Sequence, residues 1–360
     1  MLSKLGWNKD IEIIFDSFVE KDIRPARIIS RYKNHYRVAG DFGEATTVIQ
    51  GKIRYSANSN RDYPVVGDWV IVLLDNMNNV QTIKAIFPRQ NTLMRKMPGS
   101  RKRLDEGKIE EQVIGANIDV IFIVMGLDRD YNLNRLERYL SLVRISKAQP
   151  VIILNKTDLC PNAMAYLTEV TTAVNNKYPV HAICAKQIDE LSVIDIYLGE
   201  GRTGALIGSS GVGKSTIING LLGENRQKIT DISASVAKGR HTTTRRELIS
   251  LPHGGVLMDN PGMREIQLWA DSHTILDSFD DIEQLAGSCK FNDCRHESEP
   301  GCAVKQALDT GALSENRLNS YLKQKKELDF LEKRQSMSPN RADKEKWRAI
   351  YAKAGVKKRI

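Results

Sequence analysis

The chain has 360 residues, of which 41% are hydrophobic and 27% charged, enough apolar material for two or three domains. It holds no apolar run of about eighteen residues, which excludes a membrane-spanning helix, and acidic side chains interrupt any N-terminal signal peptide. Five cysteines, an odd number, argue against a disulfide framework and for a reducing compartment. We therefore expect a cytoplasmic protein without a membrane partner.

Charge is distributed unevenly along the sequence. Residues 1–103 hold 18 Lys and Arg against 10 Asp and Glu, residues 104–280 hold 18 against 22, and residues 281–360 hold 17 against 12. A slightly acidic centre between two basic flanks favours a polyanionic partner such as nucleic acid. A solvated surface rich in lysine explains the same charge equally well, so charge alone does not identify the partner.

The N-terminal part predicts a small β-barrel. After an extension, residues 1–26, with no clear role, short β-rich runs are separated by turn-forming residues. Five short strands in about sixty residues fit an OB-type barrel, which often binds oligonucleotides, and an SH3-like barrel fits equally. The expected strands are 27–32, 36–39, 45–53, 68–74 and 80–87.

A basic run follows these strands. No acidic residue lies between Asp75 and Asp105, and Pro98-Gly99 disfavours a helix or strand in the run, which begins at Arg89. We interpret it as a mobile basic loop that contacts RNA; a solvated linker is the alternative. The candidate RNA-contacting residues are Arg95, Lys96, Arg101, Lys102 and Arg103.

The central part predicts an α/β domain. Short apolar runs alternate with amphipathic stretches such as 134–146 and 163–175, the pattern of a doubly wound, mostly parallel sheet covered by helices. The expected buried strands are 120–125, 151–154, 180–184, 205–207 and 256–258.

One segment of this domain matches a phosphate-binding loop completely. Residues 208–215 read G-S-S-G-V-G-K-S between an apolar strand and a helix-compatible run. The backbone N–H groups would cradle phosphates, Lys214 would bridge the β- and γ-phosphates, and the Ser215 hydroxyl would bind Mg²⁺. The expected phosphate-site residues are Gly208, Ser209, Ser210, Gly211, Val212, Gly213, Lys214, Ser215 and Thr216.

A second segment predicts which base the site prefers. Residues 155–158 read N-K-T-D after a strand, and the Asp158 carboxylate can accept hydrogen bonds from guanine N1–H and its 2-amino group. Adenine would leave this carboxylate unpaired. Lys156 would pack over the base, Asn155 would tie the loop to the phosphate-binding loop, and C-A-K at 184–186 resembles an S-A-K segment. The expected base-site residues are Asn155, Lys156, Thr157, Asp158, Cys184, Ala185 and Lys186.

A segment after the last expected strand predicts a further part of the nucleotide site. Residues 259–262 read D-N-P-G and fit D-x-x-G, so Asp259 would hold Mg²⁺ and the Gly262 N–H would sense the γ-phosphate. Met263 follows, where many GTPases carry a water-orienting Gln. A thioether cannot orient water, so catalytic help must come from elsewhere.

A switch loop is expected at residues 239–245, G-R-H-T-T-T-R. Thr243 or Thr244 would reach Mg²⁺ and the γ-phosphate. His241 is the candidate catalytic residue, because an imidazole titrates near neutral pH and can orient or deprotonate water. A mobile His that contacts RNA or nothing is the alternative.

The order of these motifs differs from that of ordinary GTPases, in which the phosphate-binding loop comes first and N-K-x-D last. Here N-K-T-D precedes the phosphate-binding loop and D-x-x-G follows it. The site can still assemble if the sheet is circularly permuted. The chain then runs from Gly262 directly into the C-terminal domain, so we expect movement of this loop on hydrolysis to be passed to that domain.

The C-terminal part predicts a helical domain around a metal. The cysteine and histidine spacing C-x₄-C-x-H-x₅-C provides three thiolates and one imidazole, a closed tetrahedral set, so we expect one structural zinc per chain. A disulfide is the alternative, but it would leave one cysteine over. The expected zinc ligands are Cys289, Cys294, His296 and Cys302. The expected divisions are the extension 1–26, the barrel with its basic loop 27–103, the permuted GTPase domain 104–280, the zinc domain 281–335 and a basic tail 336–360.

Together these motifs resemble the RsgA (YjeQ) family of small ribosomal subunit biogenesis GTPases, over about residues 27–330. The resemblance implies an OB-fold, a permuted GTPase domain and a C-terminal zinc domain. It also implies hydrolysis of GTP to GDP and phosphate, stimulated by the small subunit and its rRNA during late maturation near the decoding region. His241 matches the catalytic His proposed for the family. We expect a monomer that uses Mg²⁺ with GTP.

Three alternatives are weighed against this function. A permuted GTPase of large-subunit assembly is disfavoured by the barrel and the zinc cluster. A P-loop metabolic kinase is disfavoured by Asp158 and by the lack of an acceptor-site signature. An RNA-binding module whose GTP site is only structural is distinguished by a turnover assay.

Overall fold

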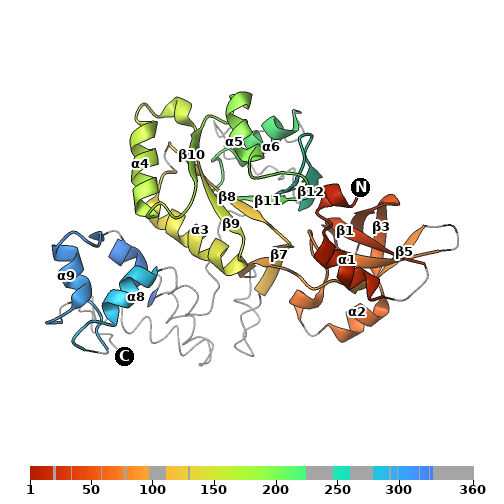
Figure 1. The fold of residues 1–360 in the computed structure, drawn as a ribbon, viewed down its shortest axis with the longest axis horizontal. Helices are drawn as coiled ribbons and strands as arrows, with labels where there is room; N and C mark the ends of the chain where they lie inside the picture. Colours follow the sequence, from red (N-terminus) through yellow and green to blue (C-terminus); the bar gives the residue numbers. More distant parts are fainter. Residues whose placement is uncertain are drawn as a thin grey trace, which may run out of the picture. The chain divides into compact units, whose positions relative to one another are not determined.

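The computed structural model describes residues 1–18, 22–33, 35–57, 59–75, 77, 79–96, 111–128, 130–223, 246–259, 279–291, 293–297, 299–315, 317–323 and 325–326. It divides into two compact units (Figure 1). The first comprises Met1–Arg95 and Gln112–Gln267, and the second comprises Lys96–Glu111 and Leu268–Ile360. Among the described helices, none combines the length and the apolar character needed to cross a bilayer.

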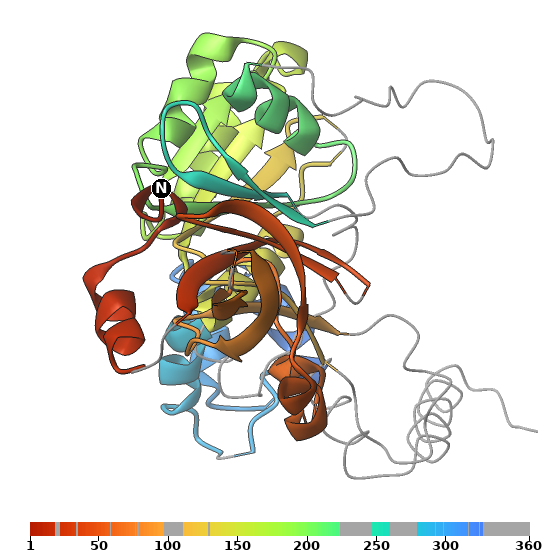
Figure 2. The same cartoon turned by 90° about the vertical axis from the view of Figure 1, so that its right-hand side faces the viewer.

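Five strands of the first unit wrap into a closed barrel (Figure 2). They are adjacent in the order β1 (Ile23–Tyr32), β2 (His35–Gly40), β3 (Gly43–Ile49), β5 (Val80–Ile86) and β4 (Trp69–Leu74), and β4 pairs back with β1. The β3–β5 pair is parallel and the other pairs are antiparallel. This closure confirms the expected OB-type barrel. Its interior is apolar and includes Ile28, Val38, Val70, Val72 and Ile83.

The expected strand 45–53 is wrong at its C-terminal end. The Gln50 N–H still donates a ladder bond to the Ile83 carbonyl, at 2.9 Å, but the Gln50 carbonyl then accepts from Ile53 N–H and starts helix α2 (Gly51–Ser56). The short apolar alternation at this point fits a strand and a helical turn equally well. The pairing of neighbouring strands, which is not visible in the local sequence, decides where the strand ends.

Residues 1–18 pack against the rest of the first unit, although the sequence shows no clear role for them. They form η1 (Ser3–Leu5) and helix α1 (Lys9–Asp16). The ring of Trp7 lies 5.0 Å from the ring of Trp69, edge to face. Leu5 and Ile11 are buried, so these residues contribute to the core.

A buried arginine, Arg27, ties this segment to the barrel. Its guanidinium donates to the carbonyls of Leu5, Gly67 and Asn117, the last two at 3.2 and 3.0 Å. Burial lowers the pKa of Arg27 to about 10, and nearby Asp119 and Asp68 oppose this effect. A buried charge is tolerated where its donors are satisfied, and here three segments of the chain provide the acceptors.

The basic run after the barrel is partly a strand. Strand β6 (Thr92–Lys96) pairs with β7 (Glu111–Ala116), so Arg95 and Lys96 lie on a strand where the sequence predicts a loop. Its partner strand is separated from it in sequence, and local residue preferences do not reveal such a pairing. Arg101, Lys102 and Arg103 lie outside the described residues.

Arg89, at the start of the basic run, has a structural role. Its guanidinium donates to both carboxylate oxygens of Asp68, at 2.7 and 2.8 Å, and to the backbone carbonyls of Arg61 and Tyr63. The Asp68 side chain is fully buried. Losing one partner of such a pair leaves an uncompensated buried charge, so Arg89 stabilises the barrel.

The second part of the first unit is a six-stranded sheet. The strands lie in the order β10 (Val180–Ile183), β9 (Gln149–Asn155), β8 (Val120–Gly126), β11 (Thr203–Ile207), β13 (Val256–Asp259) and β12 (Glu247–Ser250). The first five are parallel, as expected, and β12, which the sequence did not predict, is antiparallel to β13. β12 also pairs with β1 of the barrel, so the two parts form one continuous sheet.

Helices cover both faces of this sheet (Figure 1). α3 (Leu133–Ser146) and α4 (Ala163–Ala173) pack on one face, and η4 (Ile188–Leu191), α5 (Ser192–Asp195) and α6 (Lys214–Leu222) pack on the other. This is the expected doubly wound architecture. The carboxyl ends of parallel strands share one edge, so the loops after β9, β10 and β11 meet there, beside the end of β13.

The described part of the second unit is small. Helices α8 (Asp280–Ala286) and α9 (Ala303–Asp309) pack around Phe279, Ile282, Val304 and Tyr321. Further helical residues occur at 317–323, in line with the expected helical pattern. The buried side chains of this described part contribute little burial energy by themselves, so an additional stabilising element is expected.

Candidate nucleotide site and metal centre

The phosphate-binding loop depends on two of its glycines. Gly208 and Gly213 have φ angles of +148° and +101°, which side-chain-bearing residues rarely adopt. A Cβ on Gly208 would lie 2.2 Å from the Val124 carbonyl oxygen, and one on Gly213 would lie 2.2 Å from the Asn155 amide nitrogen. The loop therefore passes close to β8 and to the N-K-T-D segment, and it leads into the N-terminus of α6.

Lys214 stands at the first position of α6 and folds back over the loop. Its ammonium donates to the carbonyls of Gly208 and Ser209, at 2.8 and 2.6 Å. Ser215 and Thr216 follow in the first turn. A positive side chain beside the N–H groups of a loop and a helix N-terminus is suited to a phosphate chain.

Asn155 joins three loops. At the end of β9 its side-chain amide donates to the Val212 carbonyl at 2.7 Å, and its oxygen accepts from Ala185 N–H at 2.9 Å. The side chain is buried. One residue thus ties the phosphate-binding loop to both expected guanine-contacting segments; the sequence predicted the tie to the phosphate-binding loop but not the contact with Ala185.

The Asp158 carboxylate lies beside Lys186, with 2.9 Å between Oδ2 and Nζ. This hydrogen bond lowers the pKa of Asp158, so the carboxylate is ionised at neutral pH. Thr157 and Asp158 lie in η3 (Thr157–Leu159), and Lys156 before it has a left-handed backbone conformation. The Lys186 side chain is exposed and that of Asp158 is partly exposed, so the carboxylate is accessible to a ligand.

Two acidic side chains support this region and were not predicted. Asp128, beyond the end of β8, pairs with Lys156 at 2.6 Å, and Glu190 accepts from the Cys184 N–H at 2.6 Å. Burial is the largest single effect on Asp128 and favours its neutral form, but the hydrogen bonds from Lys156 and from the Asp130 N–H, together with the Lys156 charge, outweigh it and lower the pKa. The sequence signal was a carboxylate near a strand end, which is too common to single out.

Arg135 is a further contact that sequence reasoning missed. From α3 its guanidinium contacts the Ser209 hydroxyl of the phosphate-binding loop and the carboxylate of Asp130. It was predicted only as part of an amphipathic helix. Helical periodicity indicates which face is polar, but not which loop that face meets.

The predicted Mg²⁺-binding end of the nucleotide site is described in part. Asp259 ends β13, which is adjacent to β11, so Asp259 and Ser215 belong to neighbouring strand–loop units at the same edge. The predicted residues His241, Thr243, Thr244 and Gly262 lie outside the described residues, as does Met263. Their positions therefore stay predictions.

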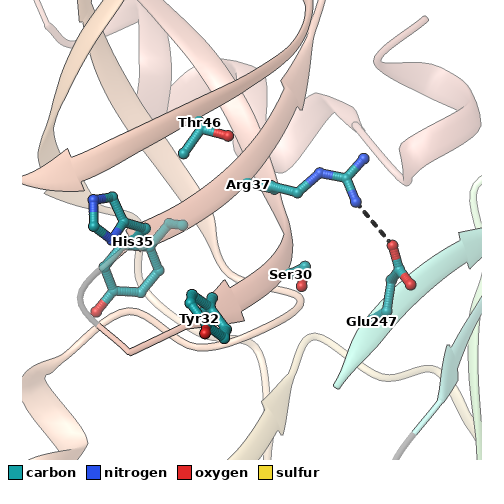
Figure 3. A pocket seen from close by; sticks show the side chains of 7 residues that line it. Ser30, Tyr32, His35, Arg37, Thr46 and Glu247 are labelled. Carbon is teal, nitrogen blue, oxygen red and sulfur yellow. Dashed lines mark hydrogen bonds and ion pairs between the residues drawn. The ribbon is translucent and has the colours of Figure 1, made fainter. Parts of the chain in front are cut away.

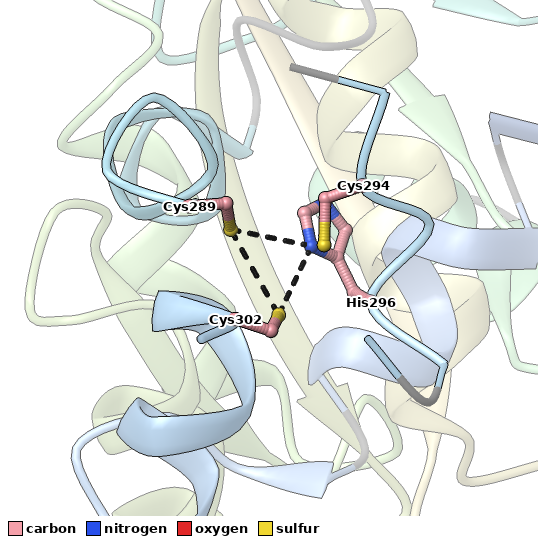
Figure 4. Close-up of side chains that lie close together, drawn as sticks. All are labelled: Cys289, Cys294, His296 and Cys302. Carbon is pink, nitrogen blue, oxygen red and sulfur yellow. Dashed lines mark hydrogen bonds between the residues drawn. The ribbon is translucent and has the colours of Figure 1, made fainter. Parts of the chain in front are cut away.

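The four predicted zinc ligands meet at one point (Figure 4). All four ligand atoms lie within 4.8 Å of one another. Cys289 Sγ is 3.8 Å from Cys302 Sγ and 3.7 Å from His296 Nδ1, and Cys302 Sγ is 3.4 Å from the same nitrogen. Cys294 completes the set.

These separations fit a tetrahedral metal and not a disulfide. Sulfur ligands about 2.3 Å from a tetrahedral zinc lie about 3.8 Å from each other, whereas bonded sulfurs lie about 2.05 Å apart. All five cysteines are free thiols. Cys289 follows α8, and Cys302 caps α9 by accepting from Lys305 N–H, so the cluster links the two helices.

Comparisons with known proteins agree with this architecture. A profile described as "RsgA GTPase" matches residues 86–269. A small ribosomal subunit biogenesis GTPase RsgA of Opitutus terrae is 39% identical over 368 aligned residues, covering 100% of this chain and 98% of the relative. Its counterpart in Syntrophotalea carbinolica is 41% identical, covering 97% and 95%.

Solved structures show the same fold. YjeQ from Thermotoga maritima has a TM-score of 0.63 at 23% identity and covers 85% of this chain and 98% of its own. A structure of YloQ, described as a circularly permuted GTPase, has a TM-score of 0.61 at 24% identity, with 86% and 96% covered.

Proposed function

Because this chain belongs to the RsgA family of circularly permuted GTPases, we propose that it hydrolyses GTP to GDP and phosphate during maturation of the small ribosomal subunit. The observation that carries this function is the junction at Asn155. It joins N-K-T-D, C-A-K and the phosphate-binding loop at one edge of the sheet, although N-K-T-D comes first in the chain.

The described residues divide the work of binding. The phosphate chain would lie along residues 208–216 with Lys214 exchanging its two carbonyl partners for phosphate oxygens. The ionised Asp158 would accept the N–H groups of guanine, and Lys156, held by Asp128, would lie beside the base. Adenine has no N–H donors at these positions, so the Asp158 carboxylate would be desolvated without gaining hydrogen bonds from the base, which makes the site selective for guanine.

Two metals are part of this proposal. Mg²⁺, when bound, would offset the charge of the β- and γ-phosphates. Ser215 and Asp259, with Thr243 or Thr244, have the hard oxygen ligands that it prefers. We propose that the Cys/His cluster holds one structural zinc, because three thiolates and an imidazole at tetrahedral separations suit that metal.

The partner is the small subunit and its rRNA. The basic N-terminal part and the OB-type barrel support RNA binding, with Arg95, Lys96, Arg101, Lys102 and Arg103 as candidate contacts. We propose that the protein acts in the cytoplasm as a monomer. His241 would assist the attacking water, since Met263 cannot, once the subunit positions the segment that carries it.

The test is GTP turnover with and without purified small subunits. We expect slow basal turnover, strong stimulation by subunits, and loss of about 10²–10⁴-fold of the stimulated rate in His241→Ala, with GTP binding retained. Lys214→Ala should impair both binding and turnover. His253→Ala, in the loop between β12 and β13, is the matched control and should behave as the parent.

If His241→Ala is stimulated as strongly as the parent, the catalytic group comes from the ribosome or another switch residue. If subunits stimulate no variant, including the parent, the proposed function itself fails.

A further inference from the structure

A groove lined by aromatic, hydroxyl and charged residues lies where the barrel meets the α/β sheet (Figure 3). Its volume is about 290 Å³, and it is lined from β1, β2, β3 and β12. Tyr32 and His35 lie at one end, and the ion pair between Arg37 and Glu247 lies at the other. None of these residues belongs to the nucleotide site described above.

One end of the groove is an aromatic platform. Tyr32 and His35 are register partners at the end of the β1–β2 hairpin, and Tyr32 is 50% exposed. The Lys33 ammonium lies 6.0 Å from the centroid of the Tyr32 ring. Exposed aromatic rings beside cations are the surfaces on which proteins stack unpaired nucleic acid bases.

The other end offers a donor and an acceptor side by side. The Arg37 guanidinium is shared between Glu44 and Glu247, with 3.1 Å between Arg37 Nη1 and Glu247 Oε1. A base that carries an amino group next to a ring acceptor can donate to Glu247 and accept from Arg37. Adenine, cytosine and guanine have this edge, and uracil lacks the amino group.

Size and charge favour a single base as the occupant. The volume is at the lower end of the range for small-molecule pockets, too small for a folded peptide element. The groove belongs to an OB-type barrel within a segment that holds 18 Lys and Arg against 10 Asp and Glu. Both properties suit one base of a polyanionic strand whose phosphates remain outside.

We propose that this groove binds one unpaired, amino-bearing base of an RNA strand, stacked on Tyr32 and hydrogen-bonded by Glu247 and Arg37. That the strand is rRNA rests on the proposed function, whereas the binding of an RNA base in the groove does not.

The position of the groove gives the base a route to the GTP site. Glu247 is the register partner of Ser30 on the barrel side and of Asp259 on the other side. β12 is therefore hydrogen-bonded both to the strand that lines the groove and to the strand that ends in a predicted Mg²⁺ ligand. A base that moves Glu247 would therefore also move β12, which pairs with the end of β13 that carries Asp259.

The direct test uses the full-length protein and a short oligouridine with one central 2-aminopurine, a fluorescent amino-bearing base. Binding should quench its fluorescence, and Tyr32→Ala should weaken binding about tenfold and remove most of the quenching. Tyr32→Phe should keep both. Tyr55→Ala is the control, because Tyr55 on α2 is 95% exposed and does not line the groove.

Base preference provides a second measurement. Oligouridine with one central adenine or cytosine should bind more tightly than oligouridine alone. Glu247→Gln should reduce this preference, since an amide presents a donor as well as an acceptor. Equal effects of Tyr32→Ala and Tyr55→Ala, or binding of free AMP or CMP as tight as that of the oligonucleotide, would overturn the proposal. Matched thermal unfolding of the variants excludes misfolding as the cause.

Subunit-stimulated turnover of the parent protein separates the two proposals. If the parent is not stimulated but Tyr32 is still required for oligonucleotide binding, the groove proposal stands and the proposed function fails. If the parent is stimulated and Tyr32→Ala binds the oligonucleotide like the parent, the groove proposal fails alone.

Discussion

The guanine-site loops and the Cys/His cluster both gather polar side chains from separate segments, but different forces hold them. At the guanine site a parallel sheet brings the loops together, and buried Asn155 bonds them to each other. In the cluster the four ligand atoms lie within 4.8 Å of one another, beside a small group of buried side chains in the described part of the second unit. The first site is organised by the fold of the sheet, whereas the proposed zinc would itself organise the fold around the second.

This difference predicts different responses to damage. A site built on a sheet should lose affinity when a contact is removed, and the sheet should survive. A site that links two short helices should lose the surrounding structure together with its ligand, because metal-binding free energy there is folding free energy.

The largest expected effect is at the metal. Cys294→Ala removes one of four ligands, and structural zinc contributes about 10–16 kcal/mol of apparent binding free energy in small domains. We expect metal content to fall from one per chain to near zero and the region around α8 and α9 to become sensitive to protease. Elemental analysis and limited proteolysis measure both changes.

Cys160→Ala is the control for this experiment. Because Cys160 lies outside the cluster, this variant should keep its metal. GTP affinity of Cys294→Ala should stay within about twofold of the parent, since the loops joined by Asn155 do not depend on the cluster ligands. Loss of both properties together would contradict the distinction between the two sites.

The next effect is at the base. Asp158→Asn removes two charge-assisted hydrogen bonds to guanine, each contributing about 1.5–3 kcal/mol, so GTP affinity should fall at least about a hundredfold. Xanthosine triphosphate should bind this variant better than GTP does, because its C2 oxygen accepts from the new amide. Nucleotide titration measures both, and exposed Asp189→Asn serves as the control. An unchanged thermal midpoint is expected, and a large decrease would argue against a site carried by the sheet.

The smallest effect concerns Lys186. Its ion pair with Asp158 is exposed, and such pairs contribute about 0–1 kcal/mol, so Lys186→Met should change GTP affinity at neutral pH by less than about fivefold. Lys186 lowers the pKa of Asp158, so without it the carboxylate is protonated at a higher pH. Affinity of the variant should therefore decline before that of the parent as the pH falls toward about 4. Parallel pH profiles would show that Lys186 does not set this pKa.

Short motifs and continuous apolar runs predicted much of this protein from sequence. The five parallel strands, the two long helices and the four cluster residues were anticipated, because each is encoded within a few neighbouring residues. Asn155 was assigned its bridging role for the same reason: N-K-T-D carries a geometry that requires an amide at that position.

The tertiary structure decided what depends on distant partners. From sequence alone, an arginine in a solvated loop looks the same as an arginine in a buried network. Only the contacts of Arg89 with Asp68 and of Arg27 with backbone carbonyls show that both are part of buried networks. The same holds for β12, whose four residues form a strand between β13 and β1, and for the end of β3. Local sequence determines which contacts a segment is able to make. Long-range pairing determines which contacts it makes, because the ladder and burial energies that stabilise them come from residues far away in the chain.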